Sequence, residues 1–343
     1  MRERELTGSL LQKSFQERML FINYCDEHNM INKIGVIGAG SMGAAIAETF
    51  AYNGYEVVLK DQNKELTEKG MKSIERILDD FISYTTRTPE KEIQRIEKIG
   101  VILTNEQKDV IRKNLKTGIK KEDIIAKIHP SETYDDMREL DFVIEAIFEN
   151  QSVKNKLFEE LSGKLSESTI LASNTSSLSV TEMAAHYRYP EKVITAHFFN
   201  PPYTLPLVEV VPAIQTSEDT IKDTFSLLQS MKNHRESIVP VKAKERAGFV
   251  VNRILIPMIN EAMKVVDEGI ADVKTVDIAM KKGAGMPMGP FELSDYVGVD
   301  IVYHVLESFR EAFGDEYLPP ETMKQMIAAG YNGRKSKRGF YTY

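Results

Sequence analysis

The sequence is poor in several residue types, and each shortage excludes a class of protein. Its 343 residues contain one cysteine, Cys25, and no tryptophan. A single cysteine excludes a disulfide within the chain and any metal site built from several cysteines, so we expect no metal centre. No run of about 18 apolar residues occurs, and the sequence therefore predicts no membrane-spanning helix.

Basic residues are outnumbered by acidic ones, 44 to 51. The formal net charge is −7 at pH 7, whereas proteins that bind nucleic acid through its phosphates usually carry a basic surface. We therefore expect a small-molecule substrate and no nucleic-acid partner. Hydrophobic residues make up 42% of the chain, which excludes a largely disordered protein, and the length predicts two or three domains.

Residues 1–30 precede the first predicted strand as an N-terminal extension. Charged residues interrupt its apolar runs and acidic residues are frequent, which disfavours a secretory signal and a transit peptide. The extension is either a short helix packed on the body or a stretch upstream of a translation start at Met19 or Met30. We expect it to be dispensable for activity and the protein to be cytoplasmic.

A glycine-rich turn follows the apolar segment 33–37, which is typical of a buried parallel strand. The turn fits the pattern G-x-G-x-x-G and consists of Gly38, Ala39, Gly40, Ser41, Met42 and Gly43. In such turns the first glycine permits the tight bend, the second lets the backbone approach a pyrophosphate, and the third allows close helix–strand packing. A helical segment at 44–51 and a strand at 56–60 complete a dinucleotide-binding unit.

Asp61 directly follows the second predicted strand, 23 positions after Gly38. This is close to the spacing of about 20 expected for the acidic residue of NAD-binding proteins. A carboxylate here accepts hydrogen bonds from the ribose hydroxyls and repels a 2′-phosphate. The sequence therefore predicts NAD as the cofactor in preference to NADP.

Two further predicted strands end in polar residues. Segment 141–147 is followed by Glu149, Asn150 and Lys154, and segment 169–173 by Asn174-Thr175-Ser176-Ser177. Open α/β sheets bind ligands at the carboxyl ends of their strands. The second cluster either contacts a ligand or supplies a helix cap at Ser177 or Ser179, and the pattern alone does not decide between these roles.

A helical insertion is predicted at about 62–135. Residues 84–127 within it contain eleven lysines and arginines against seven acidic residues. This local excess of positive charge favours either a binding site for an anionic part of the substrate or a solvated helical hairpin.

A histidine and a glutamate are the candidates for catalysis. Of the six histidines, only His197 ends an apolar predicted strand, at 193–196, and Glu209 is the only charged residue of segment 205–211. An isolated buried carboxylate is unfavourable, so we expect Glu209 to be paired, with His197 as its natural partner. Beside a nicotinamide, the histidine would take the hydroxyl proton of an alcohol while the carbon gives up hydride. The alternative is a structural histidine and a solvent-facing glutamate.

The remaining segment, 241–343, is predicted to be an all-helical domain for dimerisation and substrate binding. Segment 247–266 is helical, with an expected kink at Pro257, and another helix starts near Ala271-Asp272. The domain boundary falls near 239–244, which places the substrate in a cleft. The expected fold is thus α/β, with a Rossmann-type doubly wound sheet over 31–240 followed by the helical domain.

Several motifs occur in an order that resembles one family. They are the glycine-rich turn and the segments 142–150 (FVIEAIFEN), 173–178 (SNTSSL), 197–201 (HFFNP), 248–253 (GFVVNR) and 333–341 (GRKSKRGFY). From about residue 31 to 343 the chain resembles the L-3-hydroxyacyl-CoA dehydrogenases, including 3-hydroxybutyryl-CoA dehydrogenases. The resemblance implies a homodimer that uses NAD to oxidise short-chain (S)-3-hydroxyacyl-CoA reversibly to 3-oxoacyl-CoA.

The resemblance also implies residue roles. His197 is similar to the family's catalytic base and Glu209 to the carboxylate that orients it. Ser176 and Asn252 resemble the residues that hold the 3-oxygen of the substrate. Besides the glycine-rich turn and Asp61, the implied cofactor contacts are Glu149, Lys154, Ser176, Asn200 and Lys335.

One region departs from the family pattern. The stretch from Asp61 to Glu149 is longer than in typical members, with the surplus near 84–127. Counted from Asp61, the places of the family's CoA-binding serine and lysine fall on Ile77 and Tyr84, which do not match, so we assign no CoA contacts. The basic segment, with Lys113 and Lys116, is a hypothesis for how CoA is held instead.

Three other classes stay open on the sequence alone. A 3-hydroxyisobutyrate-type dehydrogenase shares the architecture but uses a lysine base, which the pattern of His197 and Glu209 disfavours. A hydroxy-acid dehydrogenase of the L-gulonate type has similar motifs but acts on a free acid. A non-enzymatic NAD-binding protein would not require the two side chains to be intact.

Overall fold

The structure, a computed structural model, describes residues 31–85, 89–114 and 120–343. The predictions for residues 1–30, Cys25 included, and for Lys116 lie outside these ranges. Among the described helices, none combines the length and the apolar character needed to cross a membrane.

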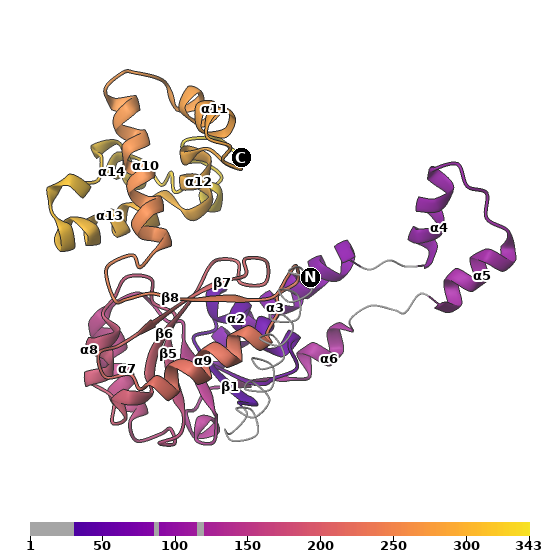
Figure 1. Ribbon diagram of the computed structural model, residues 1–343, viewed down its shortest axis with the longest axis horizontal. Coiled ribbons are helices and arrows are strands. Elements are labelled where there is room, and N and C mark those ends of the chain that lie inside the picture. The colour runs from indigo at the N-terminus through magenta and orange to yellow at the C-terminus, as the bar shows by residue number, and fades with distance from the viewer. Residues whose placement is uncertain (1–30, 86–88, 115–119) are drawn as a thin grey trace, which may run out of the picture.

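Within the described residues, eight strands form one sheet in the order β3-β2-β1-β4-β5-β6-β7-β8 (Figure 1). Neighbouring strands are parallel, except that β6 and β7 are antiparallel. The chain runs from β1 outward to β2 and β3 and then crosses to β4 on the other side of β1. Open α/β sheets bind ligands at such a reversal of strand order. The strands are β1 Lys33–Ile37, β2 Glu56–Lys60, β3 Ile128–Ser131, β4 Phe142–Glu145, β5 Ile170–Ser173, β6 Val193–Phe198, β7 Leu207–Pro212 and β8 Val239–Lys242.

Helices cover both faces of this sheet. Ile34 and Val36 of β1 belong to one hydrophobic cluster, whereas Ile37 and Val143 belong to another, because successive side chains of a strand point to opposite faces. Both faces are therefore buried, which explains why the central strands appear in the sequence as continuous apolar runs. The first cluster includes α2 Ser41–Tyr52, α3 Lys64–Thr85, α6 Lys121–Ile125 and α9 Glu218–Ser230, and the second includes α7 Gln151–Leu161 and α8 Val180–Ala185.

The rest of the described chain is helical and has its own hydrophobic core. Ile259, Phe291, Leu306 and Phe309 lie at its centre, all at most 2% exposed. The elements are α10 Val251–Asp267, α11 Val273–Gly283, α12 Pro290–Val297, α13 Val299–Phe313 and α14 Glu321–Ala328. Pro257 lies inside α10, as predicted, and the fold class expected from the sequence is confirmed.

The structure differs from the sequence prediction at two strands. β3 lies within the segment predicted as a helical insertion, and its His129 and Pro130 gave no apolar signal because it is a short edge strand, where proline is tolerated. β8 crosses the expected boundary at residue 240 and pairs with β7, so the sheet continues to Lys242.

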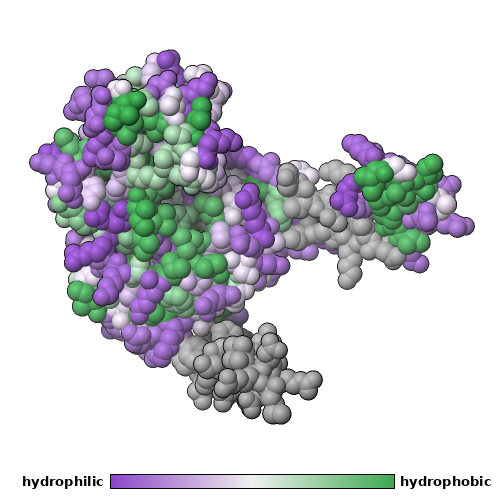
Figure 2. Space-filling view, turned by 45° about the horizontal axis from the view of Figure 1, so that its top comes forward, coloured by the Kyte–Doolittle hydropathy of each residue, from purple (hydrophilic) through white to green (hydrophobic). Residues whose placement is uncertain are grey.

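Two helices of the insertion, α4 Pro89–Lys98 and α5 Asn105–Asn114, stand away from the sheet as an arm (Figure 1). Several of its charges pair with one another, as in Arg112 with Glu90 at 3.4 Å and Lys108 with Glu97 at 2.6 Å. Apolar side chains gather on the arm (Figure 2), and Ile102, between α4 and α5, is 94% exposed. These internal ion pairs offset part of the arm's positive charge and agree with the solvated-hairpin interpretation.

Candidate active site

The glycine-rich turn has the geometry that a dinucleotide requires. Gly38 has a φ of 102°, and a Cβ on Gly43 would lie 1.7 Å from the carbonyl oxygen of Gly38, so neither position admits a side chain. At Gly40, in contrast, a Cβ would meet no atom within 4 Å. Gly40 begins α2 without a side-chain cap, so the first N–H groups of the helix remain open to a phosphate. The turn therefore fits a pyrophosphate.

Asp61 lies beside this turn at the end of β2. Its Oδ2 accepts a hydrogen bond from the backbone N–H of Ala39 at 2.6 Å, and its Oδ1 accepts one from Gln62 at 2.7 Å. The carboxylate is half-buried and is thus fixed next to the pyrophosphate position, as the ribose of NAD requires.

We expect the protein to use NADH at least tenfold better than NADPH, measured as kcat/KM. Repulsion between Asp61 and a 2′-phosphate need supply only about 1.4 kcal/mol for this ratio. Asp61→Asn keeps an oxygen acceptor for the N–H of Ala39 but removes the charge. It should lower the ratio of kcat/KM for NADH to kcat/KM for NADPH, mainly by raising the value for NADPH. Equal use of the two cofactors by the unmodified protein would contradict this prediction.

His197 and Glu209 form a buried pair, as the sequence predicts. They are directly opposite each other in the antiparallel pair β6 and β7, and Nδ1 of His197 lies 2.8 Å from Oε2 of Glu209. His197 is 7% exposed and Glu209 fully buried. The other carboxylate oxygen, Oε1, accepts hydrogen bonds from the backbone N–H groups of Val250 and Val251 at 3.0 and 2.9 Å.

These contacts determine the charge of Glu209. Burial alone would raise the pKa of Glu209, but the hydrogen bonds from His197 and from the N–H of Val251 more than offset it and hold the pKa below its usual range. Glu209 is therefore an anion that caps the first turn of α10 while it fixes the ring of His197. It joins the sheet to the helical region beside His197.

The predicted substrate residues lie on segments that contact Glu209 or the residue after His197. The Oδ1 of Asn174, beyond β5, accepts a hydrogen bond from the N–H of Phe198 at 2.8 Å, which joins the Ser176 loop to the end of β6. Asn252 lies in the first turn of α10, next to the two N–H groups that bind Glu209. The structure thus brings the segments of Ser176, His197 and Asn252 together.

Glu149 and Lys154 belong to a hydrogen-bonded network under the Ser176 loop. Oε1 of Glu149 accepts hydrogen bonds from the hydroxyl of Thr175 at 2.6 Å and the N–H of Ser176 at 3.0 Å, and Oε2 pairs with Lys154 at 3.1 Å. Burial raises the pKa of Glu149, but Lys154 and these donors outweigh it and lower the pKa. Burial lowers the pKa of Lys154, but Glu145 and Glu149 outweigh it and raise the pKa, so both groups are charged.

Two implied cofactor contacts are paired with carboxylates of the protein itself. Lys154 is 1% exposed, and Lys335, in the helical region, pairs with Asp300 at 2.6 Å. Asn200 lies exposed just past the end of β6, beside the predicted site.

Ser179 caps α8 through its hydroxyl, at 3.1 Å from the N–H of Glu182, which answers the open question of which serine is the cap.

Sequence reasoning missed three parts of this site: Asn174 as a link between loops, Glu145 beneath Lys154, and the N–H groups of Val250 and Val251. The backbone donors have no signal in side-chain identity. Glu145 had a signal in the sequence, because it is a charged residue at the end of an otherwise apolar strand.

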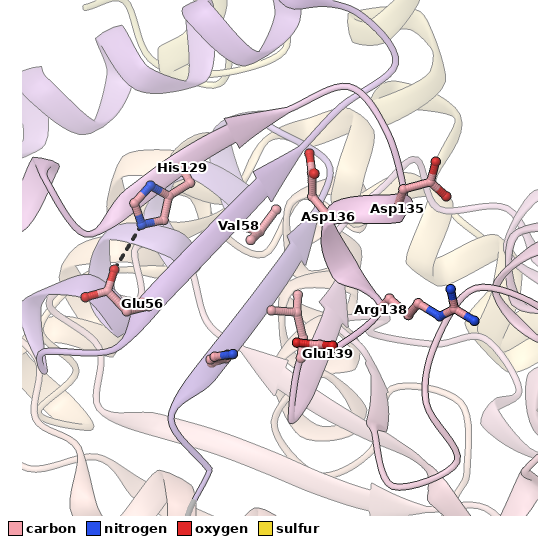
Figure 3. Close-up of a pocket in the computed structure, with 9 residues that line it drawn as sticks. Glu56, Val58, His129, Asp135, Asp136, Arg138 and Glu139 are labelled. Atoms are coloured by element: carbon pink, nitrogen blue, oxygen red, sulfur yellow. Dashed lines mark hydrogen bonds and ion pairs between the residues drawn. The ribbon is translucent and has the colours of Figure 1, made fainter.

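A cavity of about 430 Å³ lies elsewhere, at the amino ends of β1 and β2, and includes none of the predicted site residues (Figure 3). His129 and Glu56 face each other on one side of it, 2.9 Å apart, while Asp135, Asp136 and Glu139 lie across from them. Since α/β sheets bind ligands at their carboxyl ends, this charged hollow is not the active site.

Comparisons with known proteins agree with the geometry. The family profile "3-hydroxyacyl-CoA dehydrogenase, NAD binding domain" matches residues 33–106 and 89–244, and the profile "3-hydroxyacyl-CoA dehydrogenase, C-terminal domain" matches residues 248–343.

Relatives match over nearly the whole chain. The 3-hydroxybutyryl-CoA dehydrogenase of Clostridioides difficile is 36% identical over 91% of this chain and 99% of its own length. Human mitochondrial hydroxyacyl-coenzyme A dehydrogenase is 35% identical, with 92% of each chain covered. The crystal structure of (S)-3-hydroxybutyryl-CoA dehydrogenase from Ralstonia eutropha has a TM-score of 0.73 at 37% identity, over 91% of this chain and 99% of that one. The chain belongs to the 3-hydroxyacyl-CoA dehydrogenase family and is an NAD-dependent oxidoreductase.

Proposed function

We propose that the protein interconverts short-chain (S)-3-hydroxyacyl-CoA and 3-oxoacyl-CoA, with 3-hydroxybutyryl-CoA as a representative substrate. The observation that carries this proposal is the His197–Glu209 pair, held at 2.8 Å at the end of β6. The short acyl chain is supported by the names of relatives that are about 36% identical, among them the 3-hydroxybutyryl-CoA dehydrogenase of Clostridioides difficile and the (S)-3-hydroxybutyryl-CoA dehydrogenase of Ralstonia eutropha.

In the proposed reaction, His197 is the general base. Its Nδ1 faces Glu209, so Nε2 remains to accept the proton of the 3-hydroxyl group. NAD⁺, which the glycine-rich turn and Asp61 would hold, would supply the acceptor for the hydride that leaves carbon 3. Glu209 stabilises the imidazolium that forms, and Ser176 and Asn252 hold the 3-oxygen beside the ring. In the reverse direction the same imidazolium returns the proton.

Steady-state kinetics with acetoacetyl-CoA and longer 3-oxoacyl-CoAs test the substrate. We expect oxidation of NADH with acetoacetyl-CoA, a kcat/KM that falls as the acyl chain lengthens, and no reduction of NAD⁺ with L-gulonate. Turnover of L-gulonate without turnover of acetoacetyl-CoA would favour the hydroxy-acid dehydrogenase alternative.

We further propose that the protein is a homodimer formed by the helical region. Its surface carries apolar side chains that a monomer would leave in water, including Ile254 at 69% and Ile270 at 68% exposed (Figure 2).

A cytoplasmic location and a CoA-binding role for the 84–127 segment also stay predictions. Lys113, at the described end of α5, is the residue at which the second of these can be tested.

A further inference from the structure

A fully buried carboxylate, Glu145, lies beneath the proposed substrate loop. It ends β4, between Ile37 of β1 and Ser173 of β5, and is 0% exposed. Its oxygens accept hydrogen bonds from the hydroxyl of Ser173 and from the N–H of Ile147, the latter at 3.1 Å. Both oxygens also accept from Nζ of Lys154, at 2.7 and 2.9 Å.

Lys154 joins this carboxylate to a second one. Its ammonium group has three hydrogens, and three carboxylate oxygens lie within hydrogen-bond distance: two of Glu145 and one of Glu149 at 3.1 Å. The side chain is 1% exposed, so contact with a cofactor would require these bonds to break. In this arrangement Lys154 binds the carboxylates of Glu145 and Glu149 and holds them together.

Glu149 in turn contacts Ser176. Its Oε1 accepts from the N–H of Ser176 at 3.0 Å and lies 3.4 Å from the hydroxyl of the same residue. The position of that oxygen depends on Oε2, which Lys154 holds. A continuous series of contacts therefore runs from Glu145 through Lys154 and Glu149 to Ser176.

We propose that Glu145 is a positioning residue for the reaction: through Lys154 and Glu149 it fixes Ser176, and with it the 3-oxygen of the substrate beside His197. This inference rests on the proposed role of Ser176. Without the charge of Glu145, Lys154 has one anionic partner in place of two, and the attraction draws it and Glu149 together, away from their present positions. A displacement of about 1 Å at a substrate-positioning group can cost about 10²-fold in rate.

The test uses Glu145→Gln, Ser176→Ala and the double variant, each measured for kcat/KM with acetoacetyl-CoA and for NADH affinity by fluorescence. Glu145→Gln keeps the shape of the side chain and removes its charge. We expect it to lower kcat/KM by about 10- to 100-fold. In the Ser176→Ala background it should lower kcat/KM by less than about threefold further, because residues that act as a unit are not additive.

Glu48→Gln is the matched control. Glu48 is also fully buried in the sheet domain and pairs with a basic group, Nε2 of His234, at 2.8 Å, but the two residues lie outside the Ser176 loop, on α2 and between α9 and β8. Any change in its melting temperature should leave kcat/KM within about twofold. A general loss of packing would affect both variants alike.

Each result separates the two claims. If Ser176→Ala leaves kcat/KM unchanged, the proposed role of Ser176 fails and the inference fails with it. If Ser176→Ala is impaired but Glu145→Gln is not, or if their effects multiply in the double variant, the role of Ser176 stands and the inference about Glu145 is overturned.

Discussion

Replacement of His197 by glutamine is expected to lower kcat for acetoacetyl-CoA reduction by about 10²–10⁴-fold, the usual contribution of a general acid–base residue. Glutamine can accept a hydrogen bond from the substrate hydroxyl, but it cannot take up and return a proton near neutral pH. The glycine-rich turn and Asp61 belong to other loops, so the affinity for NADH should change by less than about threefold. Stopped-flow measurement of NADH oxidation together with equilibrium NADH binding checks both parts.

The chain offers a close control for this variant. The side chain of His234 is also buried and pairs with a buried glutamate, with Nε2 at 2.8 Å from Glu48, but it stacks on Phe81 of α3 and lies outside β6 and β7. His234→Gln should therefore alter thermal stability and leave kcat within about twofold. If the two variants lost activity equally, or if His197→Gln kept more than a third of kcat, the assignment of His197 as the base would be wrong.

The comparison of these histidines shows what the sequence could and could not reveal. His197 was found because it ends an apolar strand, and Glu209 because it interrupts one. His129 and His234 also pair with glutamates, yet their partners, Glu56 and Glu48, are 73 and 186 positions away. A histidine–glutamate pair is thus not diagnostic by itself; the role proposed for His197 rests on its position at the carboxyl end of β6, where open α/β sheets bind ligands.

The same limit applies to the fold. The buried strands could be predicted because both of their faces are covered, which leaves continuous apolar runs in the sequence. β3 could not, since an edge strand of four residues buries only its ends, Ile128 and Ser131. The network of Glu145 and Lys154 depends on the order of the strands, which places Glu145 beside Ser173 although 28 positions separate them.

Replacement of Glu209 by glutamine is expected to lower kcat by about 10²–10⁴-fold as well, although Glu209 is fully buried. The N–H groups of Val250 and Val251 keep an oxygen facing them, so the amide nitrogen would face Nδ1 of His197. That nitrogen is a donor, and it forces Nδ1 to be the acceptor and places the ring proton on Nε2. The histidine would then present the wrong tautomer to the substrate hydroxyl, as occurs when the aspartate of a serine-protease triad is replaced by asparagine.

Glu209→Gln also has a signature in stability that a purely catalytic residue would lack. The pKa of Glu209 is lower in the folded protein than in the unfolded chain, so its ionised form stabilises the fold at neutral pH, and this contribution is lost as the pH falls through the folded-state pKa. The melting temperature of the variant should therefore lie below that of the unmodified protein at pH 7, and the difference should shrink below the ordinary glutamate pKa of about 4.3. A kcat within threefold of that of the unmodified protein would show that Glu209 does not orient the base. A difference in melting temperature that does not depend on pH would show that Glu209 carries no charge at the start of α10.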